Sequence, residues 1–277
     1  MAYEQILYDV ADGIAVITLN RPDKLNAWTM PLGAEVRHAA FQADRDPTIK
    51  VIVVTGAGKG YCAGADMDML QGFQRGESIG GPGNGPGDDL RVEPDPSLPA
   101  AFRGEYSYPI GLTKPMIAAV NGVAAGLGVS YMLYYDMRIA SDRARFGFMF
   151  PRRGLVAEHG SAFILPRLVG MAHASDLLFS GRLVSAEEAL AMGLVNRVVP
   201  HETLMAHVRE YALELATKCS PRSLKIMKRQ LYTDQTGDLE SSMRVADAEM
   251  VASFGTEDFR EGVASFLEHR PPRFTGR

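Results

Sequence analysis

Two glycine-rich stretches of this sequence could present backbone N–H groups to a negatively charged atom. In the first, the β-branched run 51–55 leads through Gly56, Gly58 and Gly60 into Cys62-Ala-Gly-Ala-Asp66. In the second, the apolar run 116–120 leads into Asn121-Gly-Val-Ala-Ala-Gly-Leu-Gly128. The N–H groups at a helix start lack intrahelical partners and carry partial positive charge. Two such loops can aim two amides at one point, which is how an oxyanion hole is built.

Each loop also has a simpler interpretation. Glycine-rich turns between a strand and a helix are frequent in α/β proteins, so either loop alone could be a packing turn. No Gly-Lys-Ser or Gly-Lys-Thr closes the first loop, and its glycines do not follow the dinucleotide-binding pattern. The loops therefore favour an anion site over a nucleotide-phosphate site, and the packing alternative stays open.

The elements that must position these loops are those of a mixed α/β chain. Residues 6–10 and 14–19 form a predicted hairpin around Ala11-Asp-Gly13, and helical periodicity follows from Met30 to Phe41. From residue 175 onward the pattern is largely helical. Residues 71–109 contain Gly/Pro runs that cannot hold a helix or a central strand, so they are either disordered or a lid over a site.

Composition narrows the class of protein. The chain has 277 residues, of which 46% are hydrophobic and 22% charged, enough for one large domain with a sizeable core. A net charge of −4 gives no reason to expect a nucleic-acid partner. Cys62 and Cys219 lie far apart without metal-ligand spacing, so we expect reduced thiols, no metal and a cytoplasmic location. Neither a membrane span nor a signal peptide is predicted.

The order and spacing of several short motifs resemble those of the crotonase (enoyl-CoA hydratase/isomerase) superfamily over nearly the whole chain. The motifs are Ile17-Thr-Leu-Asn-Arg-Pro-Asp-Lys-Leu-Asn-Ala27, Cys62-Ala-Gly-Ala-Asp66, Lys114-Pro-Met-Ile-Ala-Ala-Val-Asn-Gly122, Asp136-Met-Arg-Ile-Ala-Ser141, Phe146-Gly147, Gly154-Leu155 and Phe259-Arg-Glu-Gly262.

The resemblance implies an α/β fold, a crotonase-like spiral of ββα units with a C-terminal helical region. Residues 1–199 would form the spiral core with an acyl-CoA site, and residues 200–277 would form a helical trimerisation region. A homotrimer or hexamer is therefore expected. Coenzyme A would enter only as part of the thioester substrate, with no separate cofactor.

The same resemblance assigns roles to individual residues. The amides of Ala65 and Leu127 would form the oxyanion hole, although the family commonly has glycine where Leu127 stands. Contacts to coenzyme A would come from Lys24, Leu25, Ala63 and Asp66, with a solvated polar turn as the alternative for Lys24. The substrate pocket would include Met67, Ser130, Phe150 and His159.

The expected chemistry depends on which carboxylates are present. Hydratases of the superfamily hold water with two glutamates, and the matching positions here are Ser130 and Phe150. Glu158 instead lies where the family's enoyl-CoA isomerases carry their acid/base carboxylate. One carboxylate suffices for a 1,3-proton shift, and residues 148–150 would surround it with apolar surface and raise its pKa. The alternative for Glu158 is an N-cap or first-turn carboxylate of the helix that follows it.

The sequence thus predicts an enzyme that isomerises the double bond of an enoyl-CoA with Glu158 as acid/base. A hydratase that uses Glu158 alone is the nearest alternative, and other enolate chemistry on the same scaffold stays open. A noncatalytic acyl-CoA or RNA-binding homologue is the alternative from another class. His159 is expected to line the pocket, because consecutive side chains diverge and a catalytic dyad with Glu158 is disfavoured.

Overall fold

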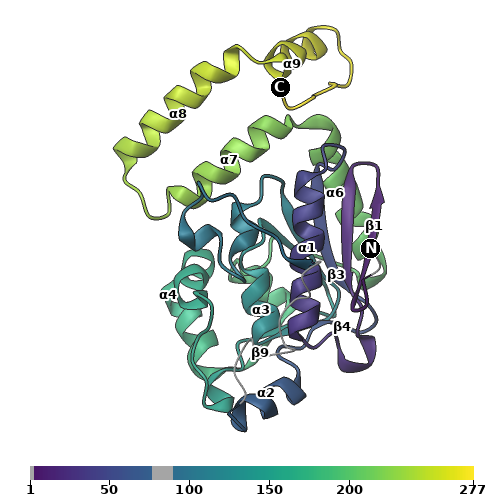
Figure 1. The fold of residues 1–277 in the computed structure, drawn as a ribbon, viewed down its shortest axis with the longest axis vertical. Helices are drawn as coiled ribbons and strands as arrows, with labels where there is room; N and C mark the ends of the chain where they lie inside the picture. The colour runs from purple at the N-terminus through teal and green to yellow at the C-terminus, as the bar shows by residue number, and fades with distance from the viewer. Residues whose placement is uncertain (1–2, 77–89) are drawn as a thin grey trace.

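A computed structural model gives the fold of residues 3–76 and 90–277. Its larger sheet has six strands in the order β1-β2-β3-β5-β7-β10 (Figure 1). The first two strands pair antiparallel and the other pairs are parallel. The strands are β1 (Ile6–Ala11), β2 (Ile14–Leu19), β3 (Val51–Gly56), β5 (Met116–Val120), β7 (Met137–Ser141) and β10 (Arg197–Val199).

The smaller sheet has four strands in the order β4-β6-β8-β9. They are β4 (Gly60–Cys62), β6 (Val123–Ala125), β8 (Arg145–Gly147) and β9 (Leu183–Ser185). Three successive strand pairs, β3/β4, β5/β6 and β7/β8, each give one strand to each sheet before the chain enters a helix. This repeated ββα unit is the spiral that the motifs predict, so the predicted fold class is confirmed.

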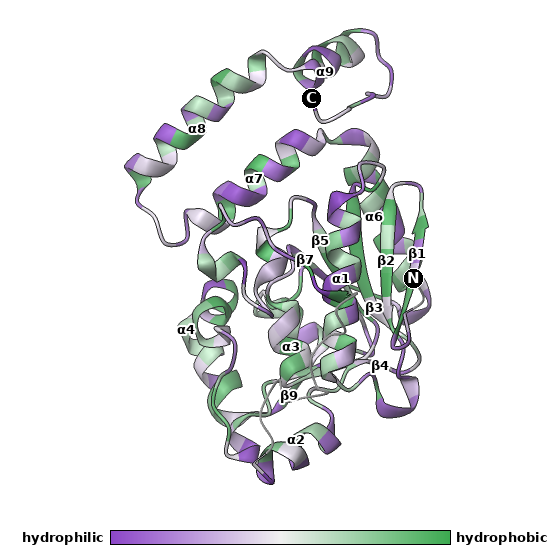
Figure 2. Ribbon diagram, viewed as in Figure 1, coloured by the Kyte–Doolittle hydropathy of each residue, from purple (hydrophilic) through white to green (hydrophobic). Residues whose placement is uncertain are grey.

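The central strands are buried on both faces, as their unbroken apolar runs predict. On one face, Val51 and Val53 of β3 pack in a cluster with Val208 of α6 (Leu204–Lys218). On the other face, Ile52 and Val54 join the larger core, which includes the inner side of α1 (Met30–Arg45). Figure 2 shows the hydrophobic colour of these strands. Because α6 completes the core, residues after 199 contribute to the spiral body as well as to the C-terminal helices.

The remaining elements complete the chain. The helices are α2 (Met67–Gln74), α3 (Leu127–Met132), α4 (Ser161–Ser180), α5 (Ala186–Ala191), α7 (Pro221–Thr233), α8 (Leu239–Phe254) and α9 (Glu257–Leu267). Short 3-10 turns are η1 (Pro22–Lys24), η3 (Ala100–Phe102), η4 (Tyr108–Gly111), η5 (Pro151–Arg153) and η6 (His201–Thr203). By length and apolar composition α4 could cross a membrane, but its backbone is non-helical at Gly170, with φ 77° and ψ 160°.

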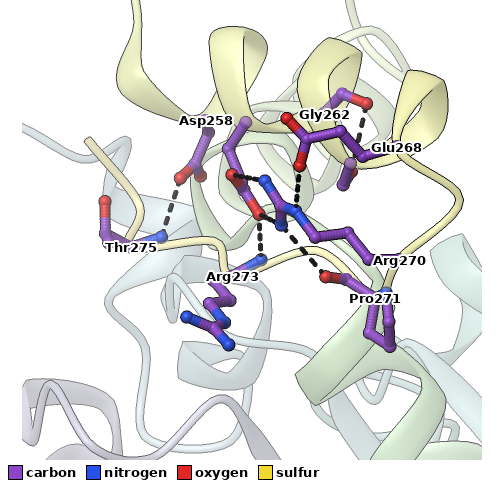
Figure 3. A network of polar contacts seen from close by, with 9 residues as sticks. Asp258, Gly262, Glu268, Arg270, Pro271, Arg273 and Thr275 are labelled. Atoms are coloured by element: carbon purple, nitrogen blue, oxygen red, sulfur yellow. Dashed lines mark hydrogen bonds and ion pairs between the residues drawn. The ribbon is translucent and has the colours of Figure 1, made fainter.

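The C-terminal helices extend away from the two sheets (Figure 1). The tail after α9 folds back onto that helix through the network in Figure 3. Arg270 donates to Glu261 at 2.5 and 2.9 Å and to Glu268 at 2.6 Å, and the Thr275 N–H donates to Asp258 at 2.7 Å. The Arg270 guanidinium is therefore held by carboxylates of its own segment.

Candidate active site

The two glycine-rich loops follow neighbouring parallel strands, so the residues after each strand begin at the same end of the smaller sheet. Strands β4 and β6 pair in parallel, with Cys62 opposite Ala124, so the residues that follow them emerge together. Gly64 makes their close approach possible: it has φ +102°, and a Cβ there would lie 2.9 Å from the Ala125 carbonyl oxygen. A side chain at Gly64 would separate the loops.

Each loop offers one unpaired amide. Leu127 is the first residue of α3, so its N–H has no intrahelical acceptor. Ala65 is held by its neighbours, because Trp28 N–H donates to Gly64 O at 2.7 Å and Asp66 N–H donates to Trp28 O at 2.9 Å. Within residues 3–76 and 90–277, no acceptor is recorded for the N–H of Ala65 or of Leu127. Both residues line one cavity, so their amides are available to a ligand there.

This main cavity has a volume of about 1000 Å³ and is bounded by the two loops, α2, residues 99–110, the start of α4 and the end of α7. Its walls are largely apolar and aromatic, as is usual for small-molecule sites. Among the described residues, Glu105 and Glu158 are the carboxylates on its walls. Its wall residues include Met30, Ala65, Met69, Leu70, Glu105, Tyr106, Leu127, Tyr134, Glu158 and His159.

Glu158 lies in the turn that precedes α4. The Ser161 N–H and hydroxyl both donate to the Glu158 carbonyl oxygen, at 2.9 and 2.7 Å. The side chain is 29% exposed, and in the described part of the molecule its Oε1 is buried without a hydrogen-bond partner. Burial raises the pKa of Glu158 to about 7. Such a carboxyl can both take and return a proton near neutral pH.

The alternative role of Glu158 as a helix cap has no support in the geometry. Gly160 is the N-cap of α4, in a left-handed conformation, and no side chain makes a capping bond there. The carboxyl group therefore faces the main cavity without a structural hydrogen bond to hold it elsewhere.

His159 lines the main cavity, as expected, but it does not form a hydrogen-bonded dyad with Glu158. Its Nε2 lies 3.8 Å from Glu158 Oε2, which exceeds hydrogen-bond length. The imidazole stacks on Tyr106 with 3.9 Å between ring centroids, and its backbone has φ 49°. Burial lowers the pKa of His159, so the ring is neutral near pH 7.

Three residues expected in the substrate pocket do not line the main cavity. Met67 starts α2 on its solvent side and is 57% exposed, while Met69 and Leu70 line the cavity instead. Ser130 is buried inside α3, and Phe150 is buried beside Phe148 with ring centroids 6.3 Å apart. These two positions face the core because α3 and the chain after β8 turn them inward.

The residues expected to contact coenzyme A lie together beside the first loop. Lys24 and Leu25 are exposed, and the Leu25 carbonyl oxygen accepts a bond from the Ala63 N–H at 3.1 Å. Asp66 is different: it caps α2 by accepting from Asp68 N–H at 2.9 Å and pairs with Arg21 at 2.8 Å. Burial opposes ionisation of Asp66, but these two partners outweigh it and lower its pKa. Asp66 is thus engaged within the protein.

Sequence reasoning missed two aromatic residues of the cavity. Tyr106 belongs to the stretch 71–109, for which Gly/Pro content predicted only a loop or lid; residues 77–89 of that stretch lie outside the described residues. Tyr134 received no role from the sequence. It follows α3, lines the cavity, and donates a hydrogen bond to the His159 carbonyl oxygen. Only the tertiary fold brings these side chains to Glu158.

Comparison with known proteins agrees with this geometry. The profile of the family described as enoyl-CoA hydratase/isomerase matches residues 9–80 and 98–277. The chain is 34% identical to 1,2-epoxyphenylacetyl-CoA isomerase of Escherichia coli over 99% of both chains. It is 37% identical to a probable enoyl-CoA hydratase of Rhodobacter capsulatus over the full length of both. The crystal structure of an enoyl-CoA hydratase from Bacillus anthracis is similar with a TM-score of 0.86 and 28% identity, covering 99% of this chain and 100% of that one.

Proposed function

The chain belongs to the enoyl-CoA hydratase/isomerase family of acyl-CoA enzymes, and we propose that it is an isomerase that moves the double bond of an enoyl-CoA with Glu158 as acid/base. One observation carries the proposal. A carboxyl group with a pKa of about 7 shares a cavity with two unpaired backbone amides. That combination serves proton transfer beside a thioester carbonyl.

The proposed reaction begins with a 3-enoyl-CoA whose thioester oxygen accepts bonds from the Ala65 and Leu127 amides. The Glu158 carboxylate removes a proton from C2, and the electron pair of the broken C–H bond delocalises onto the thioester oxygen. Backbone amides aimed at that oxygen stabilise the negative charge that develops there. The Leu127 side chain leaves this donor intact, because the donor is its main-chain N–H.

The second step returns the proton. Protonated Glu158 delivers it to C4, the former C3–C4 double bond shifts to C2–C3, and the carboxylate is regenerated. The reaction has no net gain or loss of protons, so one carboxyl group is enough. A near-neutral pKa suits a group that must act in both directions.

Hydration is the second candidate, because relatives such as the Rhodobacter capsulatus protein carry the name of a probable enoyl-CoA hydratase. It would require Glu158 alone to activate water. The positions that match the hydratase glutamates hold Ser130 and Phe150, and both are buried outside the cavity lining. The isomerase is favoured because its chemistry needs only the carboxylate present at Glu158.

Product analysis distinguishes these functions. The protein is incubated separately with a 3-enoyl-CoA and a 2-enoyl-CoA, and the products are separated by chromatography with mass detection. The proposal expects 2-enoyl-CoA from the first substrate. Formation of 3-hydroxyacyl-CoA without isomerisation would establish the hydratase instead, and acyl-CoA binding without either product would favour a noncatalytic homologue.

The proposal also covers coenzyme A binding, the oligomeric state and the cellular location. Lys24, Leu25 and Ala63 would contact coenzyme A, since they adjoin the loop that carries Ala65. A homotrimer or hexamer is supported by exposed apolar side chains on the C-terminal helices, among them Leu239, Val251, Phe266 and Leu267. Light scattering of the full chain tests this assembly.

Two free cysteines, one of them buried, are compatible with a reducing, cytoplasmic location.

A further inference from the structure

A second cavity of about 460 Å³ adjoins the main cavity and shares Met30, Glu105 and Tyr106 with it. We call it the Arg37 cavity, after the α1 residue on its wall. Tyr106 lines both cavities and packs against Trp28 of the Arg37 cavity, with 6.2 Å between their ring centroids. A group that passes Tyr106 from the Glu158 side therefore reaches the neighbourhood of Arg37.

The Arg37 guanidinium has no polar partner in the described part of the chain. Its Cζ lies 5.8 Å from the Phe41 ring centroid and 5.7 Å from the Tyr108 centroid. Its Nε is buried with no hydrogen-bond partner, and no ion pair is recorded for Arg37 among those residues. A buried donor without an acceptor is costly, and native structures rarely leave one unless a ligand completes it.

Arg45 shows that the lack of a partner is specific to Arg37. Both arginines are on α1 and both stack on Phe41, with Arg45 Cζ 5.7 Å from that ring centroid. Arg45, however, donates to the Glu93 carbonyl oxygen at 2.9 Å. Stacking on Phe41 therefore does not by itself leave an arginine without an acceptor.

Two carboxylates, those of Glu93 and Glu105, are on the walls of the Arg37 cavity together with Arg37. Neither glutamate side chain lies within ion-pair distance of Arg37 in the described residues. A guanidinium offers parallel N–H donors that match a carboxylate.

We propose that the Arg37 cavity binds a carboxylate at the far end of the substrate's acyl group, so that the preferred substrate is the mono-CoA thioester of an unsaturated dicarboxylic acid. The inference rests on the proposed function. The thioester would sit at Ala65 and Leu127, the apolar part of the chain would pass Tyr106, and the distal carboxylate would pair with Arg37. Selectivity would come from the otherwise unpaired guanidinium, which a methyl-terminated chain cannot satisfy.

The test compares two 3-enoyl-CoA substrates of equal chain length, one ending in a carboxylate and the other in its methyl ester. Calorimetric binding of the two matching saturated thioesters is measured in parallel. The full-length protein should prefer the carboxylate by about 10- to 100-fold in kcat/KM and in Kd, the size of a charge-assisted hydrogen bond. Arg37→Gln should abolish the preference while turnover of the ester changes less than about threefold.

Controls separate the role of Arg37 from effects on folding and net charge. Arg37→Lys should keep part of the preference, and Arg45→Gln, with the same loss of charge from α1, should keep all of it. Equal binding of both thioesters by the unaltered protein would overturn the proposal, as would an equal loss for both in Arg37→Gln. Stimulation of ester turnover by free glutarate would also overturn it, since the cavity would then hold a separate anion. Selective binding without isomerisation would contradict only the proposed function.

Discussion

The Tyr134 hydroxyl donates a hydrogen bond to the backbone carbonyl oxygen of His159, in the turn that carries Glu158. Tyr134 follows α3, whose first residue is Leu127, so one short helix connects a proposed oxyanion donor to the turn of the proposed acid/base. Gly160 allows this contact, because a Cβ there would lie 2.6 Å from the Tyr134 hydroxyl. The distance between amide and carboxylate is thereby set by local packing.

Tyr134→Phe should lower kcat about tenfold with little change in KM, because a small displacement of a catalytic group slows the reaction without weakening substrate binding. The free energy of unfolding should fall by about 1 kcal/mol, the typical contribution of one hydrogen bond. Steady-state kinetics and denaturant unfolding check both values. Tyr8→Phe, on edge strand β1, is the control and should leave kcat unchanged. An unaltered kcat in Tyr134→Phe would show that the turn does not need this tether.

The rate should depend on the ionisation of Glu158. The carboxylate form is the base, so kcat/KM should rise with pH to a plateau with a midpoint near 7, the pKa to which burial raises this group. Below the midpoint the rate should fall about tenfold per pH unit. Rates between pH 5 and 9 provide the profile. A plateau that extends unchanged down to pH 5 would mean that another group is the base.

The same pKa predicts an effect on stability. A carboxyl whose pKa is higher in the folded than in the unfolded protein destabilises the fold when ionised, fully above about pH 7 and not at all well below its ordinary pKa. Glu158→Gln should therefore stabilise the protein by about 1–3 kcal/mol at pH 8, after allowance for partial exposure, and by progressively less toward pH 4.5. Thermal unfolding at several pH values tests this. A pH-independent difference would argue against the raised pKa.

Gly64→Ala should reduce activity about 100-fold or more, because the added Cβ would push the two amide-bearing loops apart. Gly170→Ala is the matched control. Gly170 also has positive φ, at +77°, but a Cβ there meets nothing within 4 Å. Both variants should lose stability from backbone strain, Gly64→Ala by more because of its clash, and only Gly64→Ala should lose activity. A similar loss of activity in Gly64→Ala and Gly170→Ala would show that catalysis does not depend on the spacing of the two loops.

Much of the fold was predictable because its signals are local. Apolar runs at 51–55 and 116–120 are typical of strands buried on both faces, and both strands are buried in that way. Ser185 and Glu188 have the spacing of a capping box, which is typical of a helix start, and the Glu188 N–H donates to the Ser185 hydroxyl at 3.1 Å. Such features depend on neighbours a few residues apart along the chain.

The composition of the cavity depends on tertiary packing and was predicted less well. Ala65, Leu127, Glu158 and His159 share the cavity as expected. Tyr106 reaches it because residues 99–110 pack against α1 and the Glu158 turn, through the ring contacts Tyr108–Phe41 and Tyr106–His159. No periodicity in the sequence predicts these contacts. Met67, Ser130 and Phe150 were assigned by sequence position. Met67 lies on the solvent side of α2, and Ser130 in α3 and Phe150 after β8 are buried outside the cavity lining.

The most direct test of the account is the effect of Glu158→Gln on conversion of 3-enoyl-CoA to 2-enoyl-CoA, with binding of a saturated acyl-CoA measured alongside. The substitution keeps the size of the side chain and removes the base. We predict that kcat falls by about 1000-fold or more while Kd for the saturated thioester changes less than about threefold. Isomerisation that persists in Glu158→Gln within about tenfold of the unaltered rate would contradict the assignment of Glu158 as the acid/base.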